Sequence, residues 1–167
     1  MLVKETSIQA NFLLHSEHKY DSASNCFKHQ DSSCNGRPTE LAIVVPIYNP
    51  PANWTLEVAY SVDAIAQIFH DVPHCIIIVD DGSPNTLDIL AVAELLRNRP
   101  TLSILSYPEN RGKGFAVRYG LLHSSAKYFI YTDWDFPFGY DSLMTIYRQL
   151  TTGETSLVIG TREDEYF

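Results

Sequence analysis

The sequence of 167 residues has no long apolar run and few basic residues. Its most apolar run, Cys75–Val79, has the length of a β-strand and falls well short of the ~20 residues of a membrane helix, so no membrane span is expected. The start, Met1–Glu5, lacks the basic and apolar stretches of a secretory signal. The 20 acidic residues outnumber 12 lysines and arginines, and the formal net charge of −8 excludes general nucleic-acid binding.

Cysteine is also scarce, and the three cysteines, Cys26, Cys34 and Cys75, include no CxxC pair. An odd number without such a pair argues against a disulfide scaffold and for a reducing compartment, so we expect a cytoplasmic protein. The hydrophobic fraction of 45% and the charged fraction of 19% are ordinary for a soluble globular chain. The acidic surplus suits a divalent cation, which in turn can hold a phosphate.

The chain divides into two parts of different composition. Residues 1–39 are rich in Ser, Asn, His and Lys without sustained periodicity, and we expect a tail that is loop or disordered. Residues 40–167 alternate short apolar runs with segments of helical periodicity. Strands are expected at 41–47, 74–79, 102–106, 128–133 and 156–160, with helices between Asn53 and Phe69 and at 86–97, 114–124 and 140–151. This alternation predicts one α/β domain, a mostly parallel sheet with helices on both faces.

Polar motifs follow the predicted strands. They are Tyr48-Asn49, Asp80-Asp81, the segment from Asn110 to Lys113, and Asp133 to Asp135. In open parallel sheets ligands bind beyond the carboxyl ends of the strands, so we expect these motifs to converge on one ligand.

The pair Asp133 and Asp135 comes at the tip of an apolar strand. Alternate side chains of an extended segment share a face, so both carboxylates can reach one site. Two close carboxylates repel each other unless a cation lies between them, and oxygen ligands with open positions suit Mg²⁺ or Mn²⁺. We therefore predict a metal site here; the alternative is a solvated turn.

Two further motifs have both a functional and a structural interpretation. Asp81 is expected to accept a hydrogen bond from a ligand, while Asp80 fixes the loop or caps the following helix. Gly112 and Lys113 precede a predicted helix, where backbone N–H groups and the lysine charge would favour an anion such as a diphosphate. The alternative is a glycine-bearing turn with a solvated lysine. The spacing matches neither a P-loop nor a dinucleotide fingerprint.

Taken together, four ordered segments resemble glycosyltransferase family 2. They are Val44–Asn49, Val79–Ser83, Asn110–Gly114 and Asp133–Asp135, and the resemblance covers Leu41 to about Arg162. The Asn110–Gly114 segment most resembles the branch of dolichyl-phosphate mannose and glucose synthases. Val158–Arg162 is similar to a segment that follows the metal motif in that branch.

The resemblance implies a GT-A fold with a Rossmann-like sheet and a hexosyltransferase activity. The donor would be a UDP- or GDP-linked sugar, Mg²⁺ or Mn²⁺ the cofactor, and a polyprenyl phosphate a candidate acceptor. The resemblance implies that Pro46, Tyr48 and Asp81 line the base and ribose of the nucleotide sugar. Gly112 and Lys113 would approach the donor, and Arg162 would reach a phosphate. Asn49 and Asp80 are the other two residues implied to bind the nucleotide sugar. Asp133 would lie near the ribose or sugar, and Asp135 would bind the metal that bridges the diphosphate.

The sequence also departs from the family pattern. Pro50 stands where the family often has Glu, and family members continue beyond the equivalent of Phe167, so we expect a GT-A domain truncated at its carboxyl end. The alternative function is a truncated, non-catalytic protein that binds nucleotide sugar or a partner. A polyprenyl phosphate acceptor is already anionic and would place the chain at the cytoplasmic face of a membrane. A sheet ending at 156–160 leaves an edge that a homodimer or another partner is expected to cover.

Overall fold

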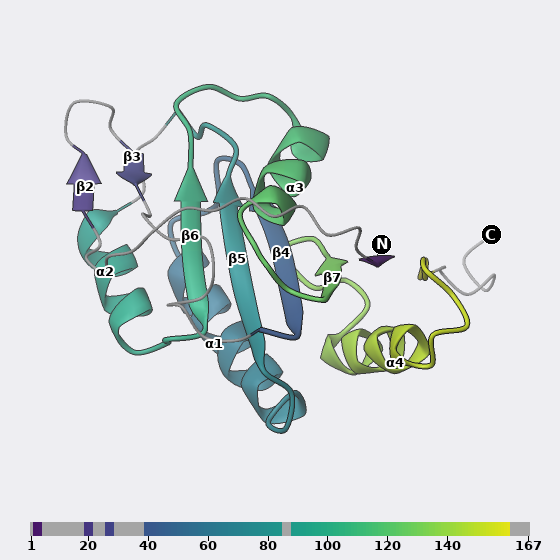
Figure 1. The fold of residues 1–167 in the computed structure, drawn as a ribbon. Helices are drawn as coiled ribbons and strands as arrows, with labels where there is room; N and C mark the ends of the chain where they lie inside the picture. The colour runs from purple at the N-terminus through teal and green to yellow at the C-terminus, as the bar shows by residue number, and fades with distance from the viewer. Residues whose placement is uncertain (1, 5–18, 22–25, 29–38, 85–87, 161–167) are drawn as a thin grey trace, which may run out of the picture.

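The computed structural model describes residues 2–4, 19–21, 26–28, 39–84 and 88–160 of the chain. Its centre is a five-stranded sheet in the order β1-β7-β4-β5-β6 (Figure 1). The four parallel strands are β4 (Leu41–Ile47), β5 (His74–Asp80), β6 (Leu102–Ser106) and β7 (Tyr128–Tyr131), and β1 (Leu2–Lys4) runs antiparallel to β7. A second, two-stranded sheet pairs β2 (Lys19–Asp21) with β3 (Cys26–Lys28).

The central strands are apolar along their whole length because both faces of the sheet are covered. Every residue of β4 is buried, and β5 is buried from Cys75 to Asp80. Continuous runs of Val, Ile and Leu are typical of parallel strands between two layers of helices. The parallel sheet predicted from these runs is therefore confirmed.

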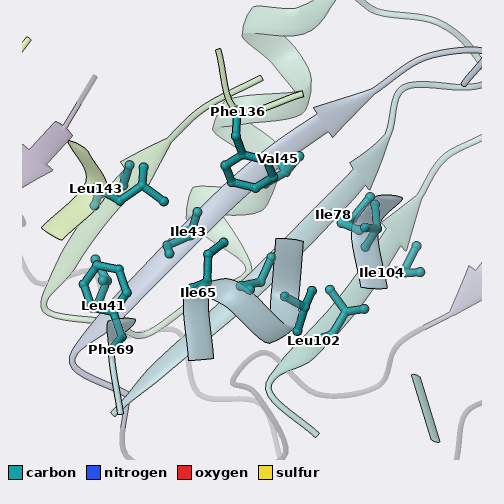
Figure 2. Packing of buried hydrophobic residues seen from close by; sticks show 14 of the residues in the cluster. Leu41, Ile43, Val45, Ile65, Phe69, Ile78, Leu102, Ile104, Phe136 and Leu143 are labelled. Carbon is teal, nitrogen blue, oxygen red and sulfur yellow. The ribbon is translucent and has the colours of Figure 1, made fainter. Parts of the chain in front are cut away.

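Three helices cover one face and one helix covers the other. Side chains of α1 (Trp54–Ile68), α2 (Ile89–Arg97) and α4 (Tyr140–Thr151) join alternate residues of the strands in the larger hydrophobic cluster (Figure 2). Helix α3 (Lys113–Leu122) packs on the opposite face through a smaller cluster. Figure 1 shows α3 and α1 on opposite sides of the sheet.

Most of the predicted elements are confirmed, with small shifts at their ends. Helix α2 begins at Ile89, where Asp88 accepts hydrogen bonds from two backbone N–H groups of the first turn, and α3 begins at Lys113. The predicted helix at 140–151 is observed with those bounds. None of the described helices is long and apolar enough to cross a membrane.

The expected strand at 156–160 is wrong. These residues form no strand, and Leu157 and Ile159 are exposed. The outer edge of β7 is instead paired with β1, so residues 156–160 do not find a hydrogen-bonding partner there. Residues 1–39, for which loop or disorder was expected, contain the short strands β1, β2 and β3. The homodimer or partner contact at the sheet edge stays a prediction.

Cys75 differs from what a reducing compartment would lead one to expect, and the cytoplasmic location stays a prediction. This residue is fully buried in β5 and is part of a disulfide. No other cysteine side chain lies in the described part of the chain. An odd number of cysteines leaves at least one thiol unpaired within the chain, but it does not exclude a single pair.

Helix α3 approaches the sheet closely at Gly120, and this contact leads to a stability prediction. An added Cβ would lie 2.6 Å from Cγ1 of Val44 and 3.0 Å from Cγ2 of Val79. We expect Gly120→Ala to lower the free energy of unfolding by about 1–3 kcal/mol, because the core must be overpacked to admit the methyl group. Urea denaturation measures the loss.

The matched control is Gly114→Ala in the same helix, where an added Cβ meets nothing within 4 Å. That change is expected to be neutral or to stabilise by up to about 1 kcal/mol, since alanine restricts the unfolded chain more than glycine does. Equal effects of the two substitutions would contradict close packing at Gly120.

Candidate functional site

The strands diverge at the point where the order of the sheet reverses. The pairing of β7 with β4 runs from Leu41 to Val44 and ends there, whereas the pairing of β5 with β4 continues to Ile47. Pro46, which has no N–H to donate, is buried in the part of β4 that pairs with β5 alone. In open α/β sheets such a reversal point is where ligands bind. The loops after β4 and β7 therefore start on either side of the expected ligand position.

Hydrogen bonds join the loops after β4 and β5. The N–H of Asp81 donates to the carbonyl of Ile47, and the N–H of Asn49 donates to Ser83 Oγ over 2.8 Å. Asn49 adopts a left-handed φ of 46°, which asparagine tolerates better than most residues. Tyr48, one residue earlier, projects into solvent and is 53% exposed. The predicted meeting of these two motifs is therefore observed.

Asp80 fixes the loop that follows β5. Its side chain is 7% exposed and accepts hydrogen bonds from both the N–H and the hydroxyl of Ser83. Burial raises the pKa of Asp80, the two hydrogen bonds from Ser83 oppose that rise, and the neighbouring charge of Asp81 adds to it. The helix cap is made by Asp88 instead. Of the two structural roles considered for Asp80, loop fixing is thus the one observed.

Asp81 is held at one oxygen by two donors from another loop. The Tyr107 hydroxyl, just after β6, donates to Asp81 Oδ1 over 2.6 Å, and the Arg111 N–H donates to the same oxygen over 2.8 Å. Asp81 as a whole residue is only 3% exposed. Burial raises the pKa of Tyr107, and the hydrogen bond to Asp81 and the charges of Asp81 and Asp80 raise it further, so Tyr107 remains a donor. The sequence analysis missed Tyr107, since a lone tyrosine after a strand gives no recognisable motif.

Lys113 and Asp133 bring the third and fourth motifs together. Lys113 is the first residue of α3, after Gly112 in the N-cap position with a φ of 88°. Its Nζ contacts Asp133 Oδ1, and the two side chains remain 54% and 46% exposed. Lys113 is therefore exposed, as in the alternative of a solvated lysine, yet it has a carboxylate partner. An ion pair this exposed adds little stability, so Lys113 can leave Asp133 for a stronger anion.

The two acids of the DxD motif lie in a loop anchored by Phe136. The Phe136 N–H donates to the Asp133 carbonyl, its φ is 46°, and its ring is buried in the larger cluster (Figure 2). Of the neighbouring aromatic residues, Phe138 is 51% exposed and Trp134 is partly buried against the same cluster. Packing thus explains Phe136, and the buried ring keeps the acidic loop against the core.

Asp135 is exposed and makes no hydrogen bond or ion pair with any described residue. In the described part of the chain no three His, Cys, Asp or Glu side chains gather into one metal-binding group. An exposed carboxylate two positions after another aspartate fits a cation such as Mg²⁺ or Mn²⁺, which takes few ligands from protein and completes its shell with water and substrate phosphate. The metal role of Asp133 and Asp135 stays a prediction.

The four motifs are thus linked by contacts at the carboxyl edge of the sheet. Asn49 is bonded to the Asp80 loop, Asp81 to the Arg111 loop, and Lys113 to Asp133. The predicted phosphate contact of Arg162 lies outside the described residues. Which of these residues bind a ligand stays a prediction, but their convergence is observed.

Comparison with known sequences gives a family match. The profile described as Glycosyl transferase family 2 matches residues 42–166. Among curated proteins, a dolichyl-phosphate beta-glucosyltransferase of Saccharomyces cerevisiae is 31% identical over 115 residues, a match that covers 66% of this chain and 33% of the yeast protein. The dolichyl-phosphate beta-glucosyltransferase of Drosophila melanogaster is 29% identical over 133 residues, covering 74% and 40%. The chain spans about a third to two fifths of the length of these relatives.

Comparison with solved structures agrees on the fold. A mannosyltransferase from Pyrobaculum calidifontis, solved with GDP-Man and Mn²⁺, has a TM-score of 0.52 and 24% identity over 72% of this chain and 34% of its own. The TarS fragment 1–349 of S. aureus has a TM-score of 0.50 and 20% identity over 68% of this chain and 33% of its own. The four parallel strands flanked by helices are therefore GT-A-like and cover part of such a domain.

The contact between the Asp81 and Asn110 loops depends on Gly82, which gives the second prediction. Its φ is +65°, and an added Cβ would lie 2.3 Å from the carbonyl carbon of Glu109 and 2.4 Å from the Asn110 nitrogen. We expect Gly82→Ala to cost about 3 kcal/mol or more of unfolding free energy, because backbone strain and a backbone clash add.

The control is Gly153→Ala, where φ is +76° but an added Cβ meets nothing within 4 Å. This change carries the strain without the clash and should cost about 1–2 kcal/mol. Urea denaturation of both variants tests the difference. Equal losses of unfolding free energy in the two variants would mean that the close contact between the Asp81 and Asn110 loops does not require glycine at position 82.

Proposed function

This chain belongs to glycosyl transferase family 2, and on that premise we propose that it binds a nucleoside diphosphate sugar at the carboxyl edge of its sheet and transfers the sugar to an acceptor. The observation that carries the proposal is the linkage of four strand-end motifs by Asn49–Ser83, Asp81–Arg111 and Lys113–Asp133 contacts. The similar mannosyltransferase solved with GDP-Man and Mn²⁺ supports a donor of this chemical class.

The residues at the edge offer different groups to different parts of such a donor. Asp81 presents a carboxylate that suits a hydrogen-bond donor of a base or ribose, and its own N–H is bonded to Ile47, the residue before the exposed Tyr48. Lys113 and the start of α3, where no side chain caps the helix, favour the diphosphate, because the N–H groups at a helix start and a cation both stabilise anions. Pro46, Asn49, Asp80 and Gly112 shape the loops around these groups.

We propose Asp135, with Asp133, as the residues that hold Mg²⁺ or Mn²⁺. Asp135 is exposed and makes no ion pair with a described residue, and among the described residues Lys113 is the ion-pair partner of Asp133. Such a cation neutralises negative charge on a leaving diphosphate. When a diphosphate approaches, Lys113 is able to exchange Asp133 for a phosphate oxygen, which would free the carboxylate.

For the acceptor we propose a polyprenyl phosphate, as the names of the dolichyl-phosphate relatives suggest. Its phosphate oxygen is already anionic at neutral pH, so the acceptor needs no protein base to remove a proton. Such a substrate would bring the chain to the cytoplasmic face of a membrane as a peripheral protein. The disulfide at Cys75 is the one observation that speaks against a reducing compartment.

A second candidate function is binding of a nucleotide sugar without transfer. The three contacts that link the motifs lie at the proposed donor position, so they account for binding of the donor alone. Turnover of a UDP- or GDP-linked sugar on a polyprenyl phosphate by the 167-residue chain would exclude this candidate.

Removal of the Asp135 charge tests the metal-dependent donor site. We expect the chain to bind GDP or UDP more tightly with Mn²⁺ than without it, and Asp135→Asn to weaken binding with Mn²⁺ by about tenfold or more, equivalent to about 1.4 kcal/mol. Without Mn²⁺ the variant and the parent should bind alike. Isothermal titration calorimetry with each nucleotide, with and without Mn²⁺, measures both effects.

The control is Asp71→Asn, which removes an equally negative and exposed side chain between α1 and β5, at the amino end of the sheet. It should leave the Mn²⁺ dependence unchanged. If the parent chain binds neither nucleotide with Mn²⁺ present, the proposed function is wrong. If Asp135→Asn keeps the full effect of Mn²⁺, only the metal assignment fails.

A further inference from the structure

We propose that Tyr107 is a positioning residue for Asp81, and that its hydroxyl, with the Arg111 N–H, reserves Asp81 Oδ2 for an N–H group of the nucleotide's base. The inference rests on the proposed function, because it assumes that a nucleotide binds at this edge. It adds a residue that lies outside all four motifs and assigns a separate task to each oxygen of one carboxylate.

The two oxygens of Asp81 have different surroundings. Oδ1 accepts from both the Tyr107 hydroxyl and the Arg111 N–H. Oδ2 accepts a hydrogen bond from no described residue. An ionised carboxylate is acceptor-only. Oδ2 is therefore suited to a ligand that donates a hydrogen bond.

The backbone of Asp81 and its donors are fixed from three sides. The Asp81 N–H is bonded to Ile47 of β4. The ring of Tyr107 makes edge contacts with Phe115 and Tyr119 of α3, with centroids 5.2 Å apart in each case. The Arg111 guanidinium lies over the Phe115 ring, 3.6 Å from its centroid, so the arginine reaches Asp81 through its backbone alone. Rotation of the carboxylate would break two hydrogen bonds in a site that is 3% exposed.

This arrangement makes a prediction about which part of a nucleotide Tyr107 influences. The Tyr107 hydroxyl is bonded to Asp81, whereas Lys113, the charged residue proposed for the diphosphate, is bonded to Asp133. Tyr107 contacts the first turn of α3 through its ring alone, against Phe115, and a phenylalanine at position 107 keeps that contact. Loss of the Tyr107 hydroxyl should therefore weaken recognition of the base and leave recognition of the diphosphate intact. A ligand without a base, ribose 5-diphosphate, separates these two contributions.

The first experiment compares Tyr107→Phe with the parent chain by calorimetry with UDP, GDP and ribose 5-diphosphate in the presence of Mn²⁺. Phenylalanine keeps the ring contacts with α3 and removes only the hydroxyl. We expect the variant to bind the better nucleotide about tenfold less tightly and to bind ribose 5-diphosphate within about twofold of the parent. The control is Tyr60→Phe on α1, which removes the hydroxyl of a ring that is 70% exposed and should change neither affinity.

A second variant, Asp81→Asn, tests the orientation directly and also serves if Tyr107→Phe fails to fold. Because Tyr107 and Arg111 both donate to the Oδ1 position, the asparagine should place its oxygen there and its NH₂ group in the place of Oδ2. The NH₂ group of the asparagine would then face the N–H group of the base, and two hydrogen-bond donors cannot bond to each other. We expect nucleotide affinity to fall by about a hundredfold while ribose 5-diphosphate binds as before.

The outcomes separate the two proposals. If the parent binds none of the three ligands, the proposed function is wrong and this inference falls with it. If the parent binds nucleotide and folded Tyr107→Phe binds it equally well, only the role of Tyr107 is overturned. If either variant loses nucleotide and ribose 5-diphosphate in equal measure, its effect is structural, and the assignment of Oδ2 to the base is wrong.

Discussion

The parallel pairing of β4 with β5 is the constraint on which the rest of the site depends. The register is continuous from Leu41 opposite His74 to Ile47 opposite Asp80, and the Asp81 N–H extends it by one more hydrogen bond to Ile47. Both strands are apolar and buried, so a slip by one residue would turn the residues of each face towards the other face. The register of the core thereby determines which side chains leave the sheet at its carboxyl edge.

The acids at this edge differ in how their charge is satisfied. Asp80 is buried and accepts hydrogen bonds from Ser83, so it fixes the loop after β5. Asp81 accepts two hydrogen bonds at Oδ1, and its Oδ2 accepts none from a described residue. Asp133 shares an exposed ion pair with Lys113, and Asp135 has no partner among the described residues. Of these four acids, the negative charge is therefore least compensated at the exposed Asp135.

Apolar runs and motif spacing were sufficient to predict the parallel strands, α4 and the convergence of the four motifs. A strand that is buried on both faces has a continuous apolar sequence, which can be recognised without a structure. Contacts between distant segments leave none: neither the Tyr107–Asp81 hydrogen bond nor the buried ring of Phe136 is visible in a local pattern. The expected strand at 156–160 was wrong for the same reason. Its sequence suits a strand, but the position beside β7 is occupied by β1, and competition for an edge cannot be read from either segment alone.

That edge pairing also bears on the order in which the molecule assembles. Leu2 pairs with Ile130, whereas β4 pairs with the strand that directly follows it in the sheet, β5. Contacts between segments distant in sequence form late, since the entropy of closing a long loop must be overcome first. A chain emerging from the ribosome can therefore join β4, β5 and β6 while β1 still lacks a partner. Until β7 has been synthesised, residues 2–4 are free to pair with other exposed strands, and chaperone binding to this segment during translation would protect the nascent chain.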